Sequence, residues 1–201
     1  MREFSIAAVV VTNLFIGTRY VWLIRKRRIK PALAMWIFFT IAVAGSLVTY
    51  LAEGGFSLWD NILNTADILL VGSVAVAIAL FGDHSARFSR FDLGCLVAVV
   101  LILVVWMLTR QHVAAHLAIQ AILVIAYLPV VRRLWRSHEN TESFAPWIGM
   151  MLAPALALLS SKGTLATVYA VRAIACTGGL LMLMLRVEWR SRALRRAGRE
   201  P

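Results

Sequence analysis

The chain has 201 residues, of which 61% are hydrophobic and only 15% charged, and its formal net charge is +11. A soluble domain of this size carries roughly a quarter charged residues, so the mean hydropathy of +0.79 excludes a water-soluble globular protein. The composition therefore predicts an integral membrane protein.

Apolar runs follow one another along the chain at residues 4–24, 32–52, 58–81, 93–109, 113–131, 144–160 and 164–185. At about 1.5 Å per residue, runs of about 17 to 24 residues match a hydrocarbon layer of about 30 Å. Because backbone groups in lipid must be satisfied within their own segment, we expect an all-α protein with seven transmembrane helices. The first run is no cleaved signal peptide, since its positive cluster "RKRRIK" follows the apolar stretch.

Basic residues are distributed unevenly between the two sides of this predicted bundle. One side has only Arg2, Arg110 and Lys162, whereas the other carries the basic connections 25–30, 82–92 and 132–140 and the tail from Arg186. Positive charge accumulates on the cytoplasmic side, which predicts the N-terminus outside and the C-terminus inside. The basic segments most simply contact anionic lipid headgroups, so the net charge indicates no nucleic-acid partner.

A weak internal repeat relates the first and last three runs. At an offset of 107 residues the first and fifth runs match, and the repeat then pairs Asn13 with Gln120, Tyr20 with Tyr127, Trp36 with Trp147, Gly55 with Gly163 and Asn64 with Arg172. The run at 93–109 has no counterpart. We therefore predict a 3+1+3 parallel repeat, with three-helix units at 1–81 and 111–186, a linker helix within 82–110 and a basic cytoplasmic tail at 187–201. Trp36 and Trp147, which open helices at the inner surface, are interpreted as headgroup anchors.

This layout resembles the SWEET sugar transporters and the wider PQ-loop family. The stretches "RYVWLIRKRRIKPALAMW" and "YLPVVRRLWRSHENTESFAPW" are also similar to those of uncharacterised seven-helix bacterial membrane proteins, so we expect a bacterial cytoplasmic membrane. The resemblance covers about residues 4–186 and implies that Pro129 is a hinge and that Asn64 and Arg172 line a pocket. The family's Pro-Gln dipeptide is absent, because Val130 follows Pro129, and an arginine stands where the family has asparagine.

Polar side chains share one face on each of two runs. On 58–81 these are Asp60, Asn61, Asn64 and Asp67, and on 164–185 they are Tyr169, Arg172, Cys176 and Gly179. At about 100° per residue each set covers one helical face, which should turn inward because charge facing lipid costs several kcal/mol. The pocket candidates are therefore Asn61, Asn64, Asp67, Tyr169 and Arg172, joined by Asn13 and Gln120, which are interpreted either as pocket lining or as interhelical hydrogen-bonding partners.

Asp67 and Arg172 lie at matching depths on these two helices, which predicts an ion pair between them. Burying two charges is costly unless they meet with good geometry. Two interpretations stay open: a structural salt bridge that locks the bundle, or a site for a substrate anion or a coupled proton, with Arg172 as a fixed fork and Asp67 as the titratable group.

The remaining chemistry-bearing residues give no catalytic pattern, so we expect no enzyme, cofactor or metal. His112 and His116 are explained as a polar helix end, and Cys95 and Cys176 as inert thiols in apolar runs. The leading hypothesis is a transporter or facilitator of a small polar solute, a sugar or a small anion, by alternating access around the third and seventh helices. The alternative is a non-transporting membrane protein, such as a sensor, scaffold or assembly partner. Whether the chain forms a homo-oligomer stays open.

Overall fold

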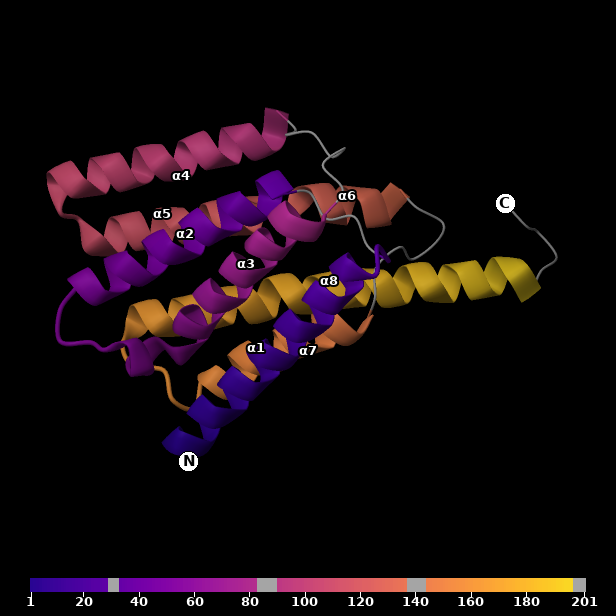
Figure 1. The fold of residues 1–201 in the computed structure, drawn as a ribbon, viewed down its shortest axis with the longest axis horizontal. Helices are drawn as coiled ribbons and strands as arrows, with labels where there is room; N and C mark the ends of the chain where they lie inside the picture. Colours follow the sequence, from indigo (N-terminus) through magenta and orange to yellow (C-terminus); the bar gives the residue numbers. More distant parts are fainter. Residues whose placement is uncertain (29–32, 83–89, 137–143, 197–201) are drawn as a thin grey trace.

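The computed structural model describes residues 1–28, 33–82, 90–136 and 144–196 (Figure 1). Every regular element among them is helical: α1 Arg2–Arg25, α2 Leu33–Ala52, the short 3-10 helix η1 Leu58–Asn61, α3 Ile62–Phe81, α4 Arg90–Thr109, α5 His112–Ile125, α6 Leu128–Arg136, α7 Phe144–Ala157 and α8 Thr164–Arg196. Within these described ranges, six helical stretches are long and apolar enough to cross a membrane, which is compatible with an integral membrane protein. The all-helical prediction is confirmed at this level.

The fifth apolar run, predicted as one helix over 113–131, is divided into α5 and α6. The chain turns at Ala126 and Tyr127, where the Tyr127 N–H donates to the Val124 carbonyl at 3.1 Å. Pro129 lies just beyond the turn and has no N–H to donate to the carbonyl four residues earlier, which accounts for the interruption. His112–Arg132 still forms one stretch long and apolar enough to cross a membrane, so the predicted span contains this turn, and the hinge role of Pro129 stays a prediction.

The last two helices differ from their apolar runs in length. α7 has 14 residues and ends three residues after its internal Pro154. The N–H groups of Ser160 and Ser161 then fold back onto the Ala157 carbonyl at 3.0 and 2.9 Å. α8 has 33 residues and continues through the basic segment to Arg196, well beyond the apolar run that ends at residue 185. Part of the predicted tail is therefore helical, and residues 197–201 lie outside the described residues.

The contacts between helices place α3 and α8 at the centre of the bundle. α3 packs between α1 and α2, and α8 packs between α5 and α7. The two groups meet through α1 with α7, through α2 with α5, and through α3 with α8, while α4 covers α2 and α5 from outside (Figure 1). The largest core cluster includes Phe38, Leu63, Ile119 and Tyr169, which come from four of these helices.

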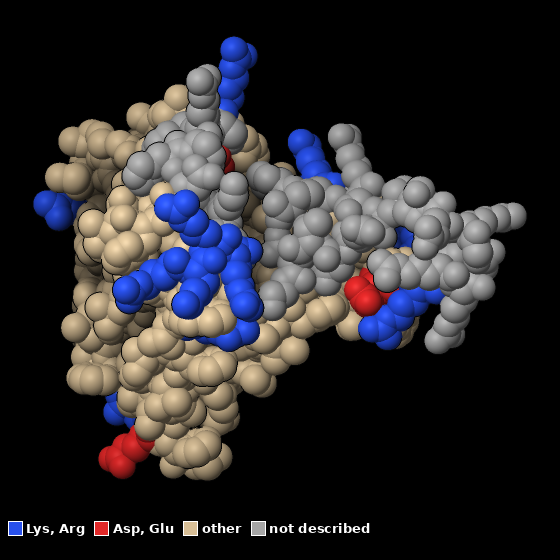
Figure 2. All heavy atoms as spheres, turned by 45° about the vertical axis from the view of Figure 1, so that its right-hand side comes forward, with Lys and Arg blue, Asp and Glu red and all other residues tan. Residues whose placement is uncertain are grey.

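The start of α1 and the end of α8 lie at opposite ends of the bundle (Figure 1). We call the end with Met1 and the α2–η1, α4–α5 and α7–α8 connections the N-terminal face, and the opposite end the C-terminal face. Figure 2 shows Lys and Arg side chains gathered at the C-terminal face, which comes forward in that view. Lys30, Arg87 and Arg199, which were also counted in predicting the orientation, lie outside the described residues. Which face is cytoplasmic stays a prediction.

Candidate functional site

A network of polar side chains joins α2, α3, α5 and α8 inside the bundle. Its members are Ser46 and Thr49 from α2, Asn64 and Asp67 from α3, His116 and Gln120 from α5, and Tyr169 and Arg172 from α8. All except Asp67 and Arg172 are buried, and those two are half-buried. The candidates predicted on two separate helical faces are thus brought together in one place.

Ser46 connects three of the four helices. Its hydroxyl oxygen accepts from Asn64 Nδ2 at 3.0 Å and from Gln120 Nε2 at 2.8 Å. If the Asn64 amide is turned over, it donates to the Val43 carbonyl at 3.0 Å, accepts from the Leu47 N–H at 3.1 Å and still contacts Ser46. In either orientation Asn64 joins α3 to α2 through Ser46, and in the turned-over orientation it also bonds to the α2 backbone.

His116 belongs to this network and is fully buried. Its Nδ1 lies 3.1 Å from the Ser46 carbonyl and 3.3 Å from Thr49 Oγ1, and its Nε2 lies 3.3 Å from Gln120 Nε2. Because a carbonyl only accepts, the proton is assigned to Nδ1, and Nε2 then accepts from the Gln120 amide. The interpretation of His116 as a polar helix end is wrong. The available signal was its spacing of four residues from Gln120, which puts both on one face.

Asp67 and Arg172 are joined through Tyr169. The Tyr169 hydroxyl donates to Asp67 Oδ2 at 2.8 Å, and the Arg172 guanidinium carbon lies 4.7 Å from the centre of the Tyr169 ring. Arg172 Nε turns away and donates to Gln120 Oε1 at 3.1 Å. Among the described residues Asp67 and Arg172 form no ion pair, so the predicted direct pair is wrong. The i, i+3 spacing on α8 puts the phenol ring under the guanidinium and between the two charges.

Two further predicted residues, Asn13 and Asn61, have hydrogen-bond donors without a partner. Asn61 caps α3 by accepting from the Asn64 N–H at 3.3 Å, and Asn13 reaches from α1 toward Asp67. Both side chains are buried, yet within the described residues neither Nδ2 has an acceptor. An unsatisfied buried donor costs about 1–3 kcal/mol, so two of them beside a charged network are a feature that needs a reason.

A separate charged cluster closes the N-terminal face, and we call it the Asp60 cluster: Arg2, Ser57, Asp60 and Lys162. Asp60 Oδ1 lies 2.6 Å from Arg2 Nη2 and 3.0 Å from Lys162 Nζ. Asp60 Oδ2 accepts from the Ser57 N–H and hydroxyl at 2.9 and 2.8 Å. The Asp60 carbonyl also accepts from the Lys162 N–H at 2.9 Å. The cluster therefore ties the start of α1, η1 and the α7–α8 turn together.

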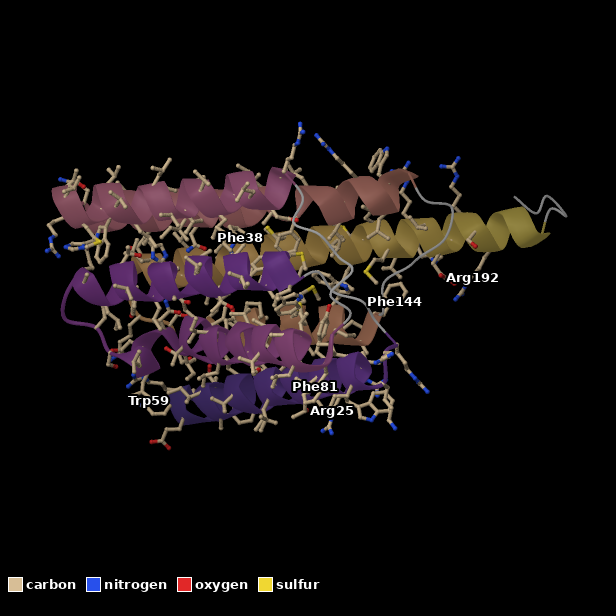
Figure 3. The ribbon with its side chains drawn as sticks, turned by 45° about the horizontal axis from the view of Figure 1, so that its top comes forward. Arg25, Phe38, Trp59, Phe81, Phe144 and Arg192 are labelled. Carbon is tan, nitrogen blue, oxygen red and sulfur yellow. The ribbon has the colours of Figure 1, made fainter. Side chains whose placement is uncertain are left out.

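The other predicted positions lie away from the network. Pro129 lies in α6, toward the C-terminal face. Trp36 is buried and its ring centre lies 5.1 Å from that of Tyr20, so its interpretation as a headgroup anchor is wrong. Figure 3 shows the N-terminal face at Trp59, which precedes Asp60 and Asn61 in the chain, at the other end of the bundle from Arg25 and Phe81. Cys95 is a buried free thiol, and Cys176 is a half-buried one.

Comparisons of this chain with protein-family models, with curated proteins and with solved structures found no match. Within residues 1–28, 33–82, 90–136 and 144–196, no group of three or more His, Cys, Asp or Glu side chains has the arrangement needed for a metal ion.

Proposed function

We propose that this chain is a transporter or facilitator of a small polar solute, a sugar or a small anion, that works by alternating access around α3 and α8. The observation that carries the proposal is the unpaired state of Asp67 and Arg172 within one network. A buried ion pair that only locks a bundle needs direct contact, because desolvation of each charge must be offset. Ionisable groups held inside the membrane without that contact mark solute or proton pathways by default.

The network leaves specific groups free for a solute. Arg172 uses Nε for Gln120 and its guanidinium stacks on the Tyr169 ring, so within the described part of the chain no carboxylate pairs with it directly. Asp67 uses Oδ2 for Tyr169, and the Nδ2 groups of Asn13 and Asn61 donate to nothing described. These atoms supply donors for solute oxygens and one carboxylate oxygen as an acceptor or a proton carrier. They are the functional groups that a polar solute crossing between α3 and α8 needs.

The pairwise contacts between helices support a 3+1+3 repeat as the frame of this function. Exchanging α1 with α5, α2 with α7 and α3 with α8 converts three of the observed contacts into other observed ones: α1–α3 into α5–α8, α2–α3 into α7–α8, and α1–α7 into α5–α2. The smaller α3–α7 contact has no such counterpart. Helix α4 stays outside the exchange, as a linker would. Parallel repeats of this kind are a common plan for secondary transporters.

Two aromatic pairs at equivalent positions give independent support for the repeat. Tyr20 packs on Trp36 with ring centres 5.1 Å apart and planes at 55°. Tyr127 packs on Trp147 with ring centres 6.1 Å apart and planes at 59°. The offset of 107 residues pairs the two tyrosines, and each tryptophan lies near the start of the next helix, so a similar contact occurs in both units.

Access to the network from the N-terminal face is opposed by the Asp60 cluster. Lys162 comes from the second unit, whereas Arg2 and Asp60 come from the first, so the cluster holds the units together at this end. Tyr50 strengthens the contact, because its hydroxyl donates to the Lys162 carbonyl at 3.0 Å. In the proposed cycle, a solute reaches Asp67 from this side only after the cluster has opened.

A solute-uptake screen in liposomes tests the proposal. Purified protein is reconstituted and uptake of labelled neutral sugars and small anions is compared with that of protein-free liposomes. We expect one class of solute to enter faster, and the gain to be lost in Arg172→Gln. The matched control is Arg192→Gln, which makes the same change at an exposed arginine on α8 whose partner is Glu188. If folded wild-type protein moves no solute, or if Arg172→Gln transports normally, the proposal is wrong.

One observation favours the alternative of a non-transporting sensor, scaffold or assembly partner. α8 continues past its apolar run as a basic helix with an exposed Trp189, which offers a surface outside the membrane segment. Normal structure without uptake of any tested solute, together with a protein partner that is lost when the chain stops after residue 186, would support that alternative.

A further inference from the structure

A groove of about 440 Å³ lies on α8 near the C-terminal face. Met182, Leu185, Arg186 and Trp189 line it. These residues recur at i, i+3, i+4 and i+7, so they form one stripe along the helix. All four side chains are exposed, with Met182 and Trp189 at 68% and 69%. The stripe therefore lies on the outer surface of the bundle and is separate from the polar network inside.

Helix α6 fixes the cationic group of this stripe. The guanidinium carbon of Arg186 lies 4.4 Å from the ring centre of Trp135, which is itself exposed on α6. Leu134, the neighbour of Trp135, is fully buried and packs with Met184 of α8. Because buried contacts anchor α6 and a cation–π contact orients Arg186, the guanidinium is held at the groove instead of extending freely into solvent.

The groove crosses the boundary between apolar and charged sequence. Arg186 is the first charged residue after the apolar run that ends at 185, so Met182 and Leu185 lie on the apolar side. Trp189 and the exposed Arg190 lie on the polar side. Tryptophan is enriched at the level of lipid headgroups, and basic pockets beside transmembrane helices are suited to lipid phosphates.

We propose that this groove binds one molecule of an anionic phospholipid. The phosphate contacts the Arg186 guanidinium, and one acyl chain lies along Met182 and Leu185. Arg190, exposed and four residues after Arg186 on the same helix, adds positive charge beside the headgroup. The nearby carboxylate of Glu188 does not oppose this charge, because it is already paired with Arg192 at 3.1 Å.

The charge and shape of the groove favour a lipid over other occupants. A second copy of the chain, docked by two-fold symmetry, would bring the same arginines against one another. A soluble anion would satisfy Arg186 but leave the Met182 and Leu185 side chains uncovered. A phospholipid matches both halves, and it does so whether or not the protein transports a solute.

Native mass spectrometry of the full chain in detergent tests this proposal. Phosphatidylglycerol and phosphatidylcholine with the same acyl chains are titrated separately, with glycerol phosphate added as a soluble form of the headgroup. We expect one phosphatidylglycerol to be retained in preference to phosphatidylcholine, without displacement by glycerol phosphate. Arg186→Gln should weaken phosphatidylglycerol binding by about fivefold or more, as loss of one basic residue at an anionic surface predicts.

The matched control is Arg19→Gln, because Arg19 also stacks on a tryptophan, Trp22, at 5.0 Å but belongs to α1. Its phosphatidylglycerol affinity should equal that of the wild type. A second variant, Leu185→Ser, should weaken both lipids by removing apolar contact while leaving the charge in place. Equal binding of the two lipids, displacement by glycerol phosphate, a lipid-free dimer, or full affinity in Arg186→Gln would each overturn the proposal.

Discussion

Asp60 and Asp67 lie seven residues apart at the start of the same helical segment, yet their surroundings differ. Asp60 contacts two cations, Arg2 and Lys162, and two donors of Ser57. Asp67 accepts one hydrogen bond, from the neutral hydroxyl of Tyr169. The cation nearest to it in the network, Arg172, directs its Nε to Gln120 instead. The charge of the Asp60 carboxylate is therefore compensated by two cations, whereas the Asp67 carboxylate has no cation in direct contact.

This difference separates a structural charge from one available for function. The contacts of Asp60 join three segments of the chain, so removing its charge should loosen the N-terminal face. Asp67 accepts from the Tyr169 hydroxyl and forms no direct ion pair with Arg172, whose Nε donates to Gln120. Breaking a fully compensated group should reduce stability, whereas changing an open one should reduce activity more than stability.

The largest expected effect is on uptake in Arg172 variants. Arg172→Gln removes the guanidinium that the solute is proposed to contact, so uptake in liposomes should fall by at least about tenfold. Arg172→Lys should not restore it, because an ammonium keeps the charge but lacks the planar fork that bonds Gln120 and the solute together. Initial uptake rates at equal amounts of reconstituted protein measure this effect. Wild-type rates in Arg172→Lys would show that only the charge matters.

Asp60→Asn should lower thermal stability. It leaves Arg2 and Lys162 without their anion, which should cost about 1–3 kcal/mol, as for other hydrogen bonds to charged groups. The unfolding temperature in detergent, followed by circular dichroism, measures the change, with exposed Glu53→Gln as the matched control. An unchanged unfolding temperature would mean that the Asp60 cluster does not hold the N-terminal face.

Tyr169→Phe should give a smaller effect, because it removes a single hydroxyl and preserves the ring under Arg172. Asp67 then loses its described hydrogen bond, worth about 1 kcal/mol. We expect uptake to fall severalfold and the unfolding temperature to change by only a few degrees. A loss of stability as large as that of Asp60→Asn would assign Tyr169 a purely structural role.

The smallest effect should come from salt. Arg2 and Lys162 are partly exposed, so about 1 M salt should screen their attraction to Asp60, whereas the buried network is shielded. The unfolding temperature of the wild type should therefore decrease slightly, and that of Asp60→Asn should not. The same salt response in both proteins would contradict the assignment of the screened contact to Asp60.

Helical periodicity predicted much of the candidate site, because it fixes which residues share a face. Asn64 and Asp67 on α3, and Tyr169 and Arg172 on α8, were identified in this way. Ser46 was missed, since one serine among the apolar residues of α2 carries no pattern. The ion pair was predicted wrongly for a different reason: matching depths of Asp67 and Arg172 along the bundle do not say which side chain lies between them.

For the fold, too, the sequence pattern predicted some features and missed others. Hydrophobic runs located the helices well, because apolar length is set by the bilayer. They did not locate the interruption between α5 and α6, where Pro129 was visible but helix-breaking residues are tolerated in membrane helices. Nor did composition reveal that the basic segment after Arg186 continues α8, since positive charge alone does not decide between a helix and a loop.

Uptake by Asp67→Asn and Asp60→Asn, measured side by side in liposomes with the unfolding temperature of each, tests the proposed site most directly. We expect Asp67→Asn to lose most uptake of the solute while unfolding near the wild-type temperature. Asp60→Asn should unfold at a lower temperature but keep its uptake, or increase it because the N-terminal face opens more easily. Retained uptake in Asp67→Asn, with loss of uptake in folded Asp60→Asn, would contradict the assignment of the site to the network between α3 and α8.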